Sequence, residues 1–144
     1  MKTLIAYYSH SGNNEKVAYD LKERTGSTIY QVCEKKKRNT ISILFDVLFT
    51  RNSKLDNILI NFEEFDSVIF VAPVWGGRIA APMRAFIEKQ KHLLNEFYYV
   101  TVCNGDNGQK DKIFNELISI TNRSPRSVIE LSINNLLPAD KKTK

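Results

Sequence analysis

A run of hydroxyl and amide side chains follows the first apolar segment of the sequence: Ser9-His10-Ser11-Gly12-Asn13-Asn14. A helical pattern begins at its end, and the N–H groups and dipole of a helix N-terminus favour an anion. The run has neither the Gly-x-x-x-x-Gly-Lys-Ser/Thr pattern of a nucleoside-triphosphate loop nor the Gly-x-Gly-x-x-Gly dinucleotide fingerprint. Its hydroxyls and amides indicate one terminal phosphate held by neutral donors. Ser and Asn also serve as ordinary helix N-caps, so both interpretations stay open for this loop alone.

A second loop, Pro73-Val74-Trp75-Gly76-Gly77-Arg78, directly follows the apolar run Val68–Ala72 and holds the only tryptophan of the chain. Two consecutive glycines permit positive φ and let the backbone approach a flat ligand closely. The indole offers a large face for stacking. This loop therefore predicts an aromatic wall beside a planar group, and Arg78 either attracts a substrate phosphate or caps surface carbonyls.

A third loop, Asn104-Gly105-Asp106-Asn107-Gly108, follows the apolar run that ends at Cys103. By itself it reads equally well as an ordinary tight turn. In an open parallel α/β sheet, however, ligands bind beyond the carboxyl ends of the strands, near the point where the strand order reverses. Together the three loops predict a phosphate cup, an aromatic wall and a polar backbone rim, which suit a phosphorylated flat heterocycle.

Alternating strands and helices are predicted to position these loops. Strands are expected at Thr3–Tyr8, Val68–Ala72, Phe97–Cys103 and Ser127–Ile133, with a weaker edge strand at Ser27–Cys33; helices are expected at Asn14–Arg24, Thr40–Thr50, Pro82–Lys91 and Lys110–Thr121. Near-continuous apolar strands are typical of a parallel sheet covered on both faces. The alternation predicts a three-layer α/β/α sandwich in one domain, residues 1–140, with a basic tail at 141–144.

The predicted helix Thr40–Thr50 carries an apolar stripe that includes Ile41, Leu44, Phe45 and Leu48. Such a stripe covers a sheet face in most α/β domains. The sequence leaves open two other uses, contact with a second copy of the chain and lining of the site's mouth.

The net charge of +5 is concentrated in residues 22–54, which hold eight basic and three acidic residues. Its focus is Lys35-Lys36-Lys37-Arg38. This cluster reads either as a solvated loop or as a docking patch for an anionic partner, such as a dinucleotide phosphate, an acidic protein or an anionic surface. No aromatic side chains interleave with the charges, so nucleic acid is not an expected partner.

The composition, 42% apolar and 26% charged, is that of an ordinary globular protein. No run approaches the roughly 18 apolar residues of a membrane span, and the N-terminus reads as a strand rather than a signal peptide. Cys33 and Cys103 each stand in an apolar stretch and are expected to be buried free thiols, which suits a cytoplasmic location. No spacing typical of metal ligands is present.

Two segments resemble the flavodoxin family, in particular its short flavodoxin-like members. Tyr-Ser-His-Ser-Gly-Asn-Asn-Glu-Lys-Val-Ala at 8–18 is similar to the family's phosphate loop, Ser/Thr-x-Ser/Thr-Gly-x-Thr. Ala-Pro-Val-Trp-Gly-Gly-Arg-Ile-Ala-Ala-Pro-Met at 72–83 is similar to the Pro-x-Trp-Gly-Gly loop beside the flavin ring. The resemblance spans nearly the whole chain in element order. It implies a five-stranded parallel sheet of order 2-1-3-4-5 and flavin mononucleotide (FMN) as the cofactor.

The resemblance also implies roles by position. The phosphate would be held by Ser9, Ser11, Gly12, Asn13 and Asn14, the ring by Pro73, Val74, Trp75, Gly76 and Gly77, and the ring's pyrimidine side by Asn104 and Gly105. His10 is either a phosphate shield or a solvent-facing loop residue. Asn14 departs from the family's Thr, which predicts weaker phosphate binding. The third loop lacks the Tyr that often covers the ring, which predicts an open outer face.

The leading functional hypothesis is an FMN-dependent oxidoreductase that passes electrons from NAD(P)H or a protein donor to a small acceptor such as a quinone. No catalytic side chain is predicted, since the flavin would supply the chemistry. The second hypothesis is a flavodoxin electron carrier. Carriers in that family are usually strongly acidic, whereas this chain has a pI of about 9.2. The third is a binding protein that kept the fold and lost FMN, since fold alone does not fix function.

Overall fold

The computed structural model describes residues 1–34, 55, 58–103 and 108–132. The predicted helix Thr40–Thr50, the basic cluster 35–38 and the tail 141–144 lie outside these residues. So do Asn104 and Gly105, the residues predicted for the ring's pyrimidine side.

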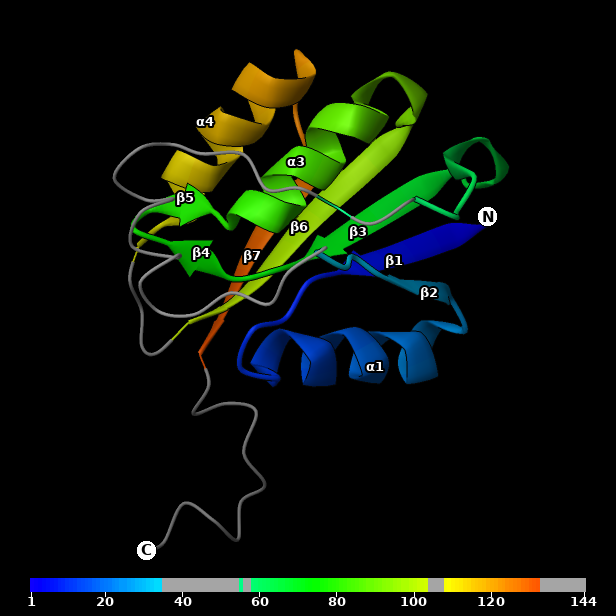
Figure 1. Ribbon diagram of the computed structural model, residues 1–144, viewed down its shortest axis with the longest axis horizontal. Helices are drawn as coiled ribbons and strands as arrows, with labels where there is room; N and C mark the ends of the chain where they lie inside the picture. Colours follow the sequence, from blue (N-terminus) through cyan, green and yellow to red (C-terminus); the bar gives the residue numbers. More distant parts are fainter. Residues whose placement is uncertain (35–54, 56–57, 104–107, 133–144) are drawn as a thin grey trace, which may run out of the picture.

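Five parallel strands form the central sheet (Figure 1). They are β1 (Thr3–Tyr7), β2 (Thr28–Gln31), β3 (Ser67–Val71), β6 (Glu96–Cys103) and β7 (Ser127–Ser132). Their spatial order is β2-β1-β3-β6-β7, and every neighbouring pair is parallel. This confirms the predicted order 2-1-3-4-5. The order reverses between β1 and β3, so these two strands open the crevice in which such sheets bind ligands.

Helices lie on both faces of the sheet, α1 on one and α3 with α4 on the other (Figure 1). Their bounds are Asn13–Thr25, Ala81–Gln90 and Lys110–Thr121, and two short 3₁₀ turns occupy Phe62–Glu64 and Lys91–Leu93. The predicted helices at 14–24, 82–91 and 110–121 are therefore confirmed to within a residue or two. Pro82 stands in the first turn of α3, where its missing N–H breaks no helical bond.

The segment after β3 differs from the predicted loop. Val74–Trp75 (β4) and Arg78–Ile79 (β5) pair antiparallel, so Gly76 and Gly77 form the tip of a tight hairpin. Both glycines have positive φ, 58° and 77°, which is the backbone that a two-residue hairpin turn requires. The short strands escaped notice because each has only two residues.

Side chains alternate between the two faces along each strand, and each face buries its own cluster. Toward α3 and α4 the cluster includes Phe70, Phe86 and Tyr99. Toward α1 it includes Ile5, Val17 and Val100. Each strand contributes side chains to both buried clusters, which is why its sequence is apolar at nearly every position.

The expectation of two buried thiols is wrong for Cys33. Both cysteines are free, but Cys33 is exposed and Cys103 only half-buried. Cys33 lies beyond the end of β2, which is an edge strand of the described sheet, so a described strand lies on one side of it only.

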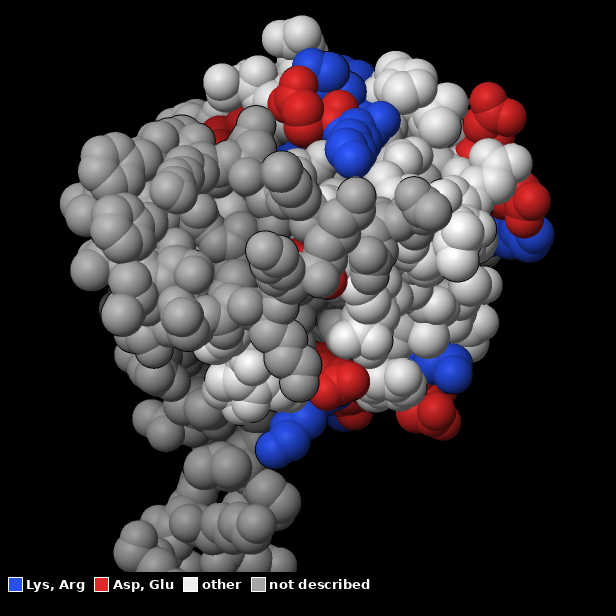
Figure 2. Space-filling view, viewed as in Figure 1, with Lys and Arg blue, Asp and Glu red and all other residues white. Residues whose placement is uncertain are grey.

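Charges of both signs lie together on the described part of the face in Figure 2. On the face in Figure 2, the described Lys and Arg side chains lie close to Asp and Glu. Exposed pairs include Arg24 with Asp20 and Lys91 with Glu88. The basic cluster 35–38, interpreted from the sequence either as a solvated loop or as a docking patch, lies outside the described residues and stays a prediction. No helix among the described residues is long and apolar enough to cross a membrane.

Phe86 is expected to carry a large share of the packing between α3 and the sheet. Its ring is fully buried, with centroids 5.4 Å from Phe62, 5.8 Å from Tyr30 and 6.5 Å from Phe70. Phe86→Ala should lower the free energy of unfolding by about 3–5 kcal/mol, the usual effect of emptying a buried aromatic site. Urea denaturation measures this. Lys89→Ala, exposed on the same helix, is the control and should change it by less than about 0.5 kcal/mol.

Candidate functional site

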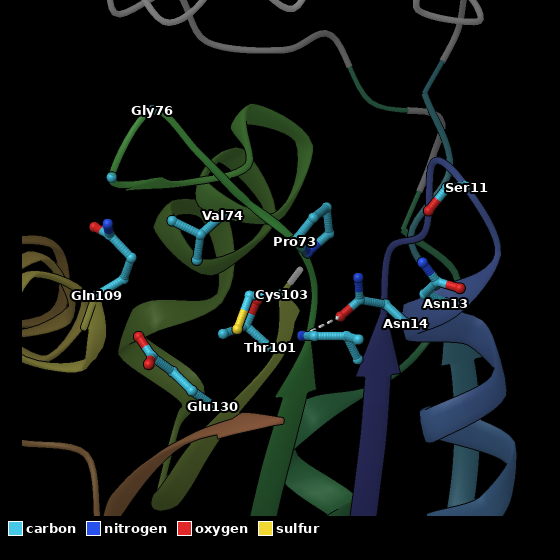
Figure 3. Close-up of a pocket in the computed structure, with 12 residues that line it drawn as sticks. Ser11, Asn13, Asn14, Pro73, Val74, Gly76, Thr101, Cys103, Gln109 and Glu130 are labelled. Carbon is cyan, nitrogen blue, oxygen red and sulfur yellow. Dashed lines mark hydrogen bonds between the residues drawn. The ribbon is translucent and has the colours of Figure 1, made fainter. Parts of the chain in front are cut away.

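A cavity of about 390 Å³ opens at the carboxyl edge of the sheet, beside the point where the strand order reverses (Figure 3). This volume lies in the range of small-molecule and cofactor sites. Its walls come from the start of α1, the β4–β5 hairpin, the ends of β6 and β7, and the residue before α4. The lining residues are Ser11, Asn13, Asn14, Pro73, Val74, Gly76, Gly77, Thr101, Val102, Cys103, Gln109 and Glu130.

The start of α1 leaves backbone donors open at one end of the cavity. Gly12 is the N-cap, with φ of 93°, and no side chain caps the helix. The first helical hydrogen bond runs from Lys16 N to Gly12 O, 3.1 Å, so the amides before it have no acceptor within the helix. Ser9 Oγ accepts from Gly12 N at 3.0 Å, which braces the turn. Unlike Ser9, the exposed Ser11 lines the cavity.

Asn14 joins this helix start to the central sheet. The residue is 3% exposed, and its Oδ1 accepts from Val102 N at 3.2 Å. Because the oxygen serves the strand, the Nδ2 group is the part left to donate to a ligand. Figure 3 shows the amide nitrogen turned away from β6, on the side of Pro73. Asn14 therefore bonds the start of α1 to β6 and keeps a donor free at that end of the cavity.

Gly77 packs closely against α4. A Cβ atom at this position would lie 3.1 Å from Gln109 Oε1 and 3.5 Å from Lys112 Nζ. Together with the positive φ, this close approach explains why the hairpin tip needs glycine. The turn of the hairpin and the start of α4 therefore form one wall.

A cluster of charged groups clamps the hairpin to α3 and α4. Glu116 of α4 accepts from Ile79 N at 2.9 Å through Oε2, and its Oε1 lies 3.7 Å from Arg84 Nη1 and 3.9 Å from Arg78 Nε. Arg84, on α3, is only 7% exposed and also donates to Ile79 O at 3.4 Å. Both backbone groups of Ile79 are thus bound, which fixes β5 and with it the glycine tip.

Tyr99 of β6 holds the residues that lead from β3 into the hairpin. Its side chain is fully buried, and its hydroxyl donates to Ala72 O at 3.3 Å and Pro73 O at 3.4 Å. Burial raises the pKa of Tyr99 well above its ordinary value, and the nearby Glu116 carboxylate raises this pKa further. The phenol therefore stays protonated and remains a donor to the strand-to-loop junction that lines the cavity.

Three aromatic rings connect the first two loops beside the cavity. The ring of Trp75 lies edge-on to Tyr8 at 5.8 Å and to His10 at 6.2 Å. Ser9, His10, Gly12 and Trp75 do not line the cavity itself. The structure thus brings together Ser11, Asn13, Asn14, Pro73, Val74, Gly76 and Gly77, places Ser9, His10, Gly12 and Trp75 in adjoining positions, and leaves Asn104 and Gly105 outside the described residues.

Sequence reasoning missed five residues of the wall: Thr101, Val102, Cys103 and Glu130, which lie on strands, and Gln109, which precedes α4. Glu130 carried a signal, because a carboxylate interrupts an otherwise apolar strand pattern. Thr101 looks like any β-branched strand residue. Among the described residues, no group of three or more His, Cys, Asp or Glu could hold a metal ion.

No protein-family model matches the chain, and no curated protein does. Solved structures do. A flavoprotein from Lactobacillus acidophilus NCFM, crystallised in complex with FMN, is 21% identical over 99% of each chain, with a TM-score of 0.72. A protein from Bacteroides eggerthii DSM 20697, provisionally assigned as a flavoprotein, is 16% identical over 98% of this chain and 92% of that chain, with a TM-score of 0.74.

A flavodoxin, WrbA-like protein from Agrobacterium tumefaciens is more distant. It is 16% identical over 84% of this chain and 71% of its own, with a TM-score of 0.56. These likenesses and the strand order β2-β1-β3-β6-β7 show that the chain has the flavodoxin-like fold.

Gly77→Ala is expected to destabilise the hairpin more than backbone strain alone would. Adding a Cβ atom to a glycine with positive φ destabilises the folded state by about 1–2 kcal/mol. The Cβ at Gly77 would also press on Gln109 Oε1. Gly26→Ala is a matched control, since Gly26 has φ of 65° with nothing within 4 Å of the added atom. Urea denaturation should show the larger loss for Gly77→Ala, and equal losses would contradict the tight wall.

Proposed function

We propose that this chain binds FMN non-covalently in the cavity at the carboxyl edge of the sheet. The observation that carries the proposal is the cavity's placement, with an uncapped helix N-terminus and neutral donors at one end and a glycine hairpin along its wall. The structure of the similar Lactobacillus acidophilus flavoprotein in complex with FMN supports it.

The residues present suit such a ligand. A phosphate at the start of α1 would meet the free backbone amides, the Ser11 hydroxyl and the Asn14 amide nitrogen. None of the described residues that line the cavity is Lys or Arg, so the anion would be held by dipoles and neutral hydrogen bonds. The ring would lie along Pro73, Val74 and the Gly76-Gly77 tip, where no Cβ stands between ligand and backbone.

We further propose that the protein is an FMN-dependent oxidoreductase with NAD(P)H or a protein as donor and a small acceptor such as a quinone. Bound FMN would supply the electron chemistry. The chain's own residues would bind, orient and shield it, with Tyr99 and Glu116 holding the ring-side wall in place. The pI of about 9.2 favours this role over that of an acidic electron carrier.

The absorbance spectrum of the purified protein tests the first proposal. Flavin bands that disappear from the protein fraction on denaturation, with FMN identified by chromatography, are the expected result. A colourless protein that also fails to take up added FMN would refute it. NAD(P)H consumption in the presence of a quinone then separates an enzyme from a carrier, because a carrier would turn over only with a partner reductase.

Asn14→Asp should separate phosphate binding from folding. The carboxylate can still accept from Val102 N, and an acidic group in the first turn of α1 suits the helix dipole, so the fold should persist. Loss of the donor and gain of a negative charge should weaken FMN binding at least about tenfold, which is about 1.4 kcal/mol. Riboflavin, which lacks the phosphate, should lose much less affinity.

Flavin fluorescence titration measures both ligands. Asn61→Asp is the matched control. Asn61 Oδ1 also accepts from a backbone N–H, that of Glu63 at 3.1 Å, but the residue precedes β3 at the opposite edge of the sheet. It should leave both affinities unchanged. Equal losses for FMN and riboflavin in Asn14→Asp would place the phosphate elsewhere.

A further inference from the structure

Positive charge exceeds negative charge where the β4–β5 hairpin meets the first turn of α4. The Glu116 carboxylate lies near two arginines, with Oε1 3.7 Å from Arg84 Nη1 and 3.9 Å from Arg78 Nε. Lys112 is exposed and stands one helical turn before Glu116 on the same face of α4. This corner of the described structure therefore presents three cations and one carboxylate. Arg84 is nearly buried, so the excess charge reaches solvent through Lys112 and through Arg78, whose side chain is 39% exposed.

Lys112 has no hydrogen-bond or ion-pair partner among the described residues. Its position is also unfavourable for α4, because a cation in the first turn of a helix lies beside the positive end of the helix dipole. Lys110 stands in the same turn, and Asp111 is the acidic residue between the two lysines. The fold therefore gains little from the charge of Lys112, which leaves that charge available to an anionic ligand.

The ammonium group of Lys112 lies at the rim of the cavity. A Cβ atom on Gly77 would be 3.5 Å from both Lys112 Cδ and Lys112 Nζ, so the lysine side chain lies along the glycine tip of the hairpin. Gly77 and Gln109, the residue before α4, both line the cavity. Figure 3 shows Gln109 and Gly76 across the cavity from Ser11, which precedes α1. The cations are thus on the side opposite the end proposed for the FMN phosphate.

This placement determines which ligand the cations suit. None of the described residues that line the cavity itself is Lys or Arg. Cations outside the cavity, beside the wall proposed for the flavin ring, would meet the anionic groups of a second molecule that approaches the ring. In a nicotinamide dinucleotide, the hydride-donating ring is joined through a ribose to a diphosphate, whereas a simple quinone has no anionic group. The cations therefore suit the electron donor and not the acceptor.

We propose that Lys112 and Arg78 bind the diphosphate of a nicotinamide dinucleotide, which makes such a dinucleotide, rather than a protein, the electron donor. The inference rests on the proposed binding of FMN. A guanidinium group offers paired N–H donors that match phosphate oxygens, and the ammonium group adds a second positive charge. The diphosphate is common to NADH and NADPH, so the pair serves both donors.

A hydride donor without phosphates tests this assignment. Loss of flavin absorbance would be followed in the FMN-loaded protein with NADH and with 1-benzyl-1,4-dihydronicotinamide, which is uncharged. Lys112→Ala should lower the second-order rate constant for NADH at least about fivefold at low salt, and that for the benzyl compound by less than about twofold. Lys112→Arg should keep most of the NADH rate, because the positive charge remains. The loss should shrink as salt is raised, since screening acts over about 10 Å near 0.1 M.

Calorimetric titration with ADP-ribose, which carries the same diphosphate, gives a readout that does not depend on turnover. Lys112→Ala should weaken binding of ADP-ribose to the FMN-loaded protein at least about fivefold. Lys89→Ala is the control, because Lys89 is exposed near the end of α3 and should leave both the affinity and the NADH rate unchanged. Lys112 is varied rather than Arg78, since Arg78 also lies beside Glu116, which holds the hairpin.

Two results would overturn the assignment on a protein that binds FMN. Equal losses with NADH and the benzyl compound would show that Lys112 acts on the flavin or the fold, and an unchanged NADH rate in Lys112→Ala would remove the lysine from donor binding. A parent protein that is reduced by the benzyl compound but neither oxidises NADH nor binds ADP-ribose would also overturn it, while FMN binding would stand. A parent that takes up no FMN would instead refute the proposed function.

Discussion

The carboxylate of Glu116 is the contact on which the geometry of the site depends. It binds the backbone of Ile79 and lies beside a nearly buried arginine, Arg84, so one side chain of α4 joins the hairpin to both helices on that face. Removing Glu116 would take the acceptor from Ile79 N and the carboxylate from beside two arginines at once. The glycine tip can therefore stay close to a ligand without a side chain of its own to anchor it. Tyr99 completes the support by binding the carbonyls at the other end of the segment.

On the other side of the cavity, the central sheet holds the start of α1 in place. Asn14 is bonded to the backbone of Val102 in β6, so the first turn of α1 is tied directly to a central strand. Gly12 supplies the left-handed turn that aims the helix start at the cavity. The two walls are thus fixed by different means, one by charge and one by a buried amide, and both tie a loop to regular structure. A rigid scaffold with functional loops at one edge is the usual way that this architecture builds a site.

Most of the fold could be predicted from sequence because apolar runs and helical periods report burial directly. Strands were predicted from apolar runs such as Thr3–Tyr8, Val68–Ala72 and Phe97–Cys103, and three helices from their helical periods. The strand order was implied by the resemblance to flavodoxins. The β4–β5 hairpin was missed because two-residue strands carry no period. Glycines and donors of the site stood out by residue type. Thr101, Gln109 and Glu130 did not, since their roles arise only when distant strands and α4 meet at one edge. Cys33 was misjudged although its strand was expected at the sheet edge, because apolar neighbours in sequence do not by themselves bury a residue at the end of an edge strand.

The two ends of the cavity place opposite demands on whatever fills it. Free amides at the start of α1 stabilise negative charge, whereas the Glu130 carboxylate opposes it. A ligand that carries an anion at one end and a hydrogen-bond donor at the other can bind in one direction only. A ligand bound the other way round would place its anion beside the Glu130 carboxylate and leave the amides of α1 unpaired. Each of these contacts is unfavourable in a partly desolvated site. The start of α1 and the Glu130 carboxylate, at opposite ends of the cavity, therefore give the site a direction that the largely apolar wall of the hairpin lacks.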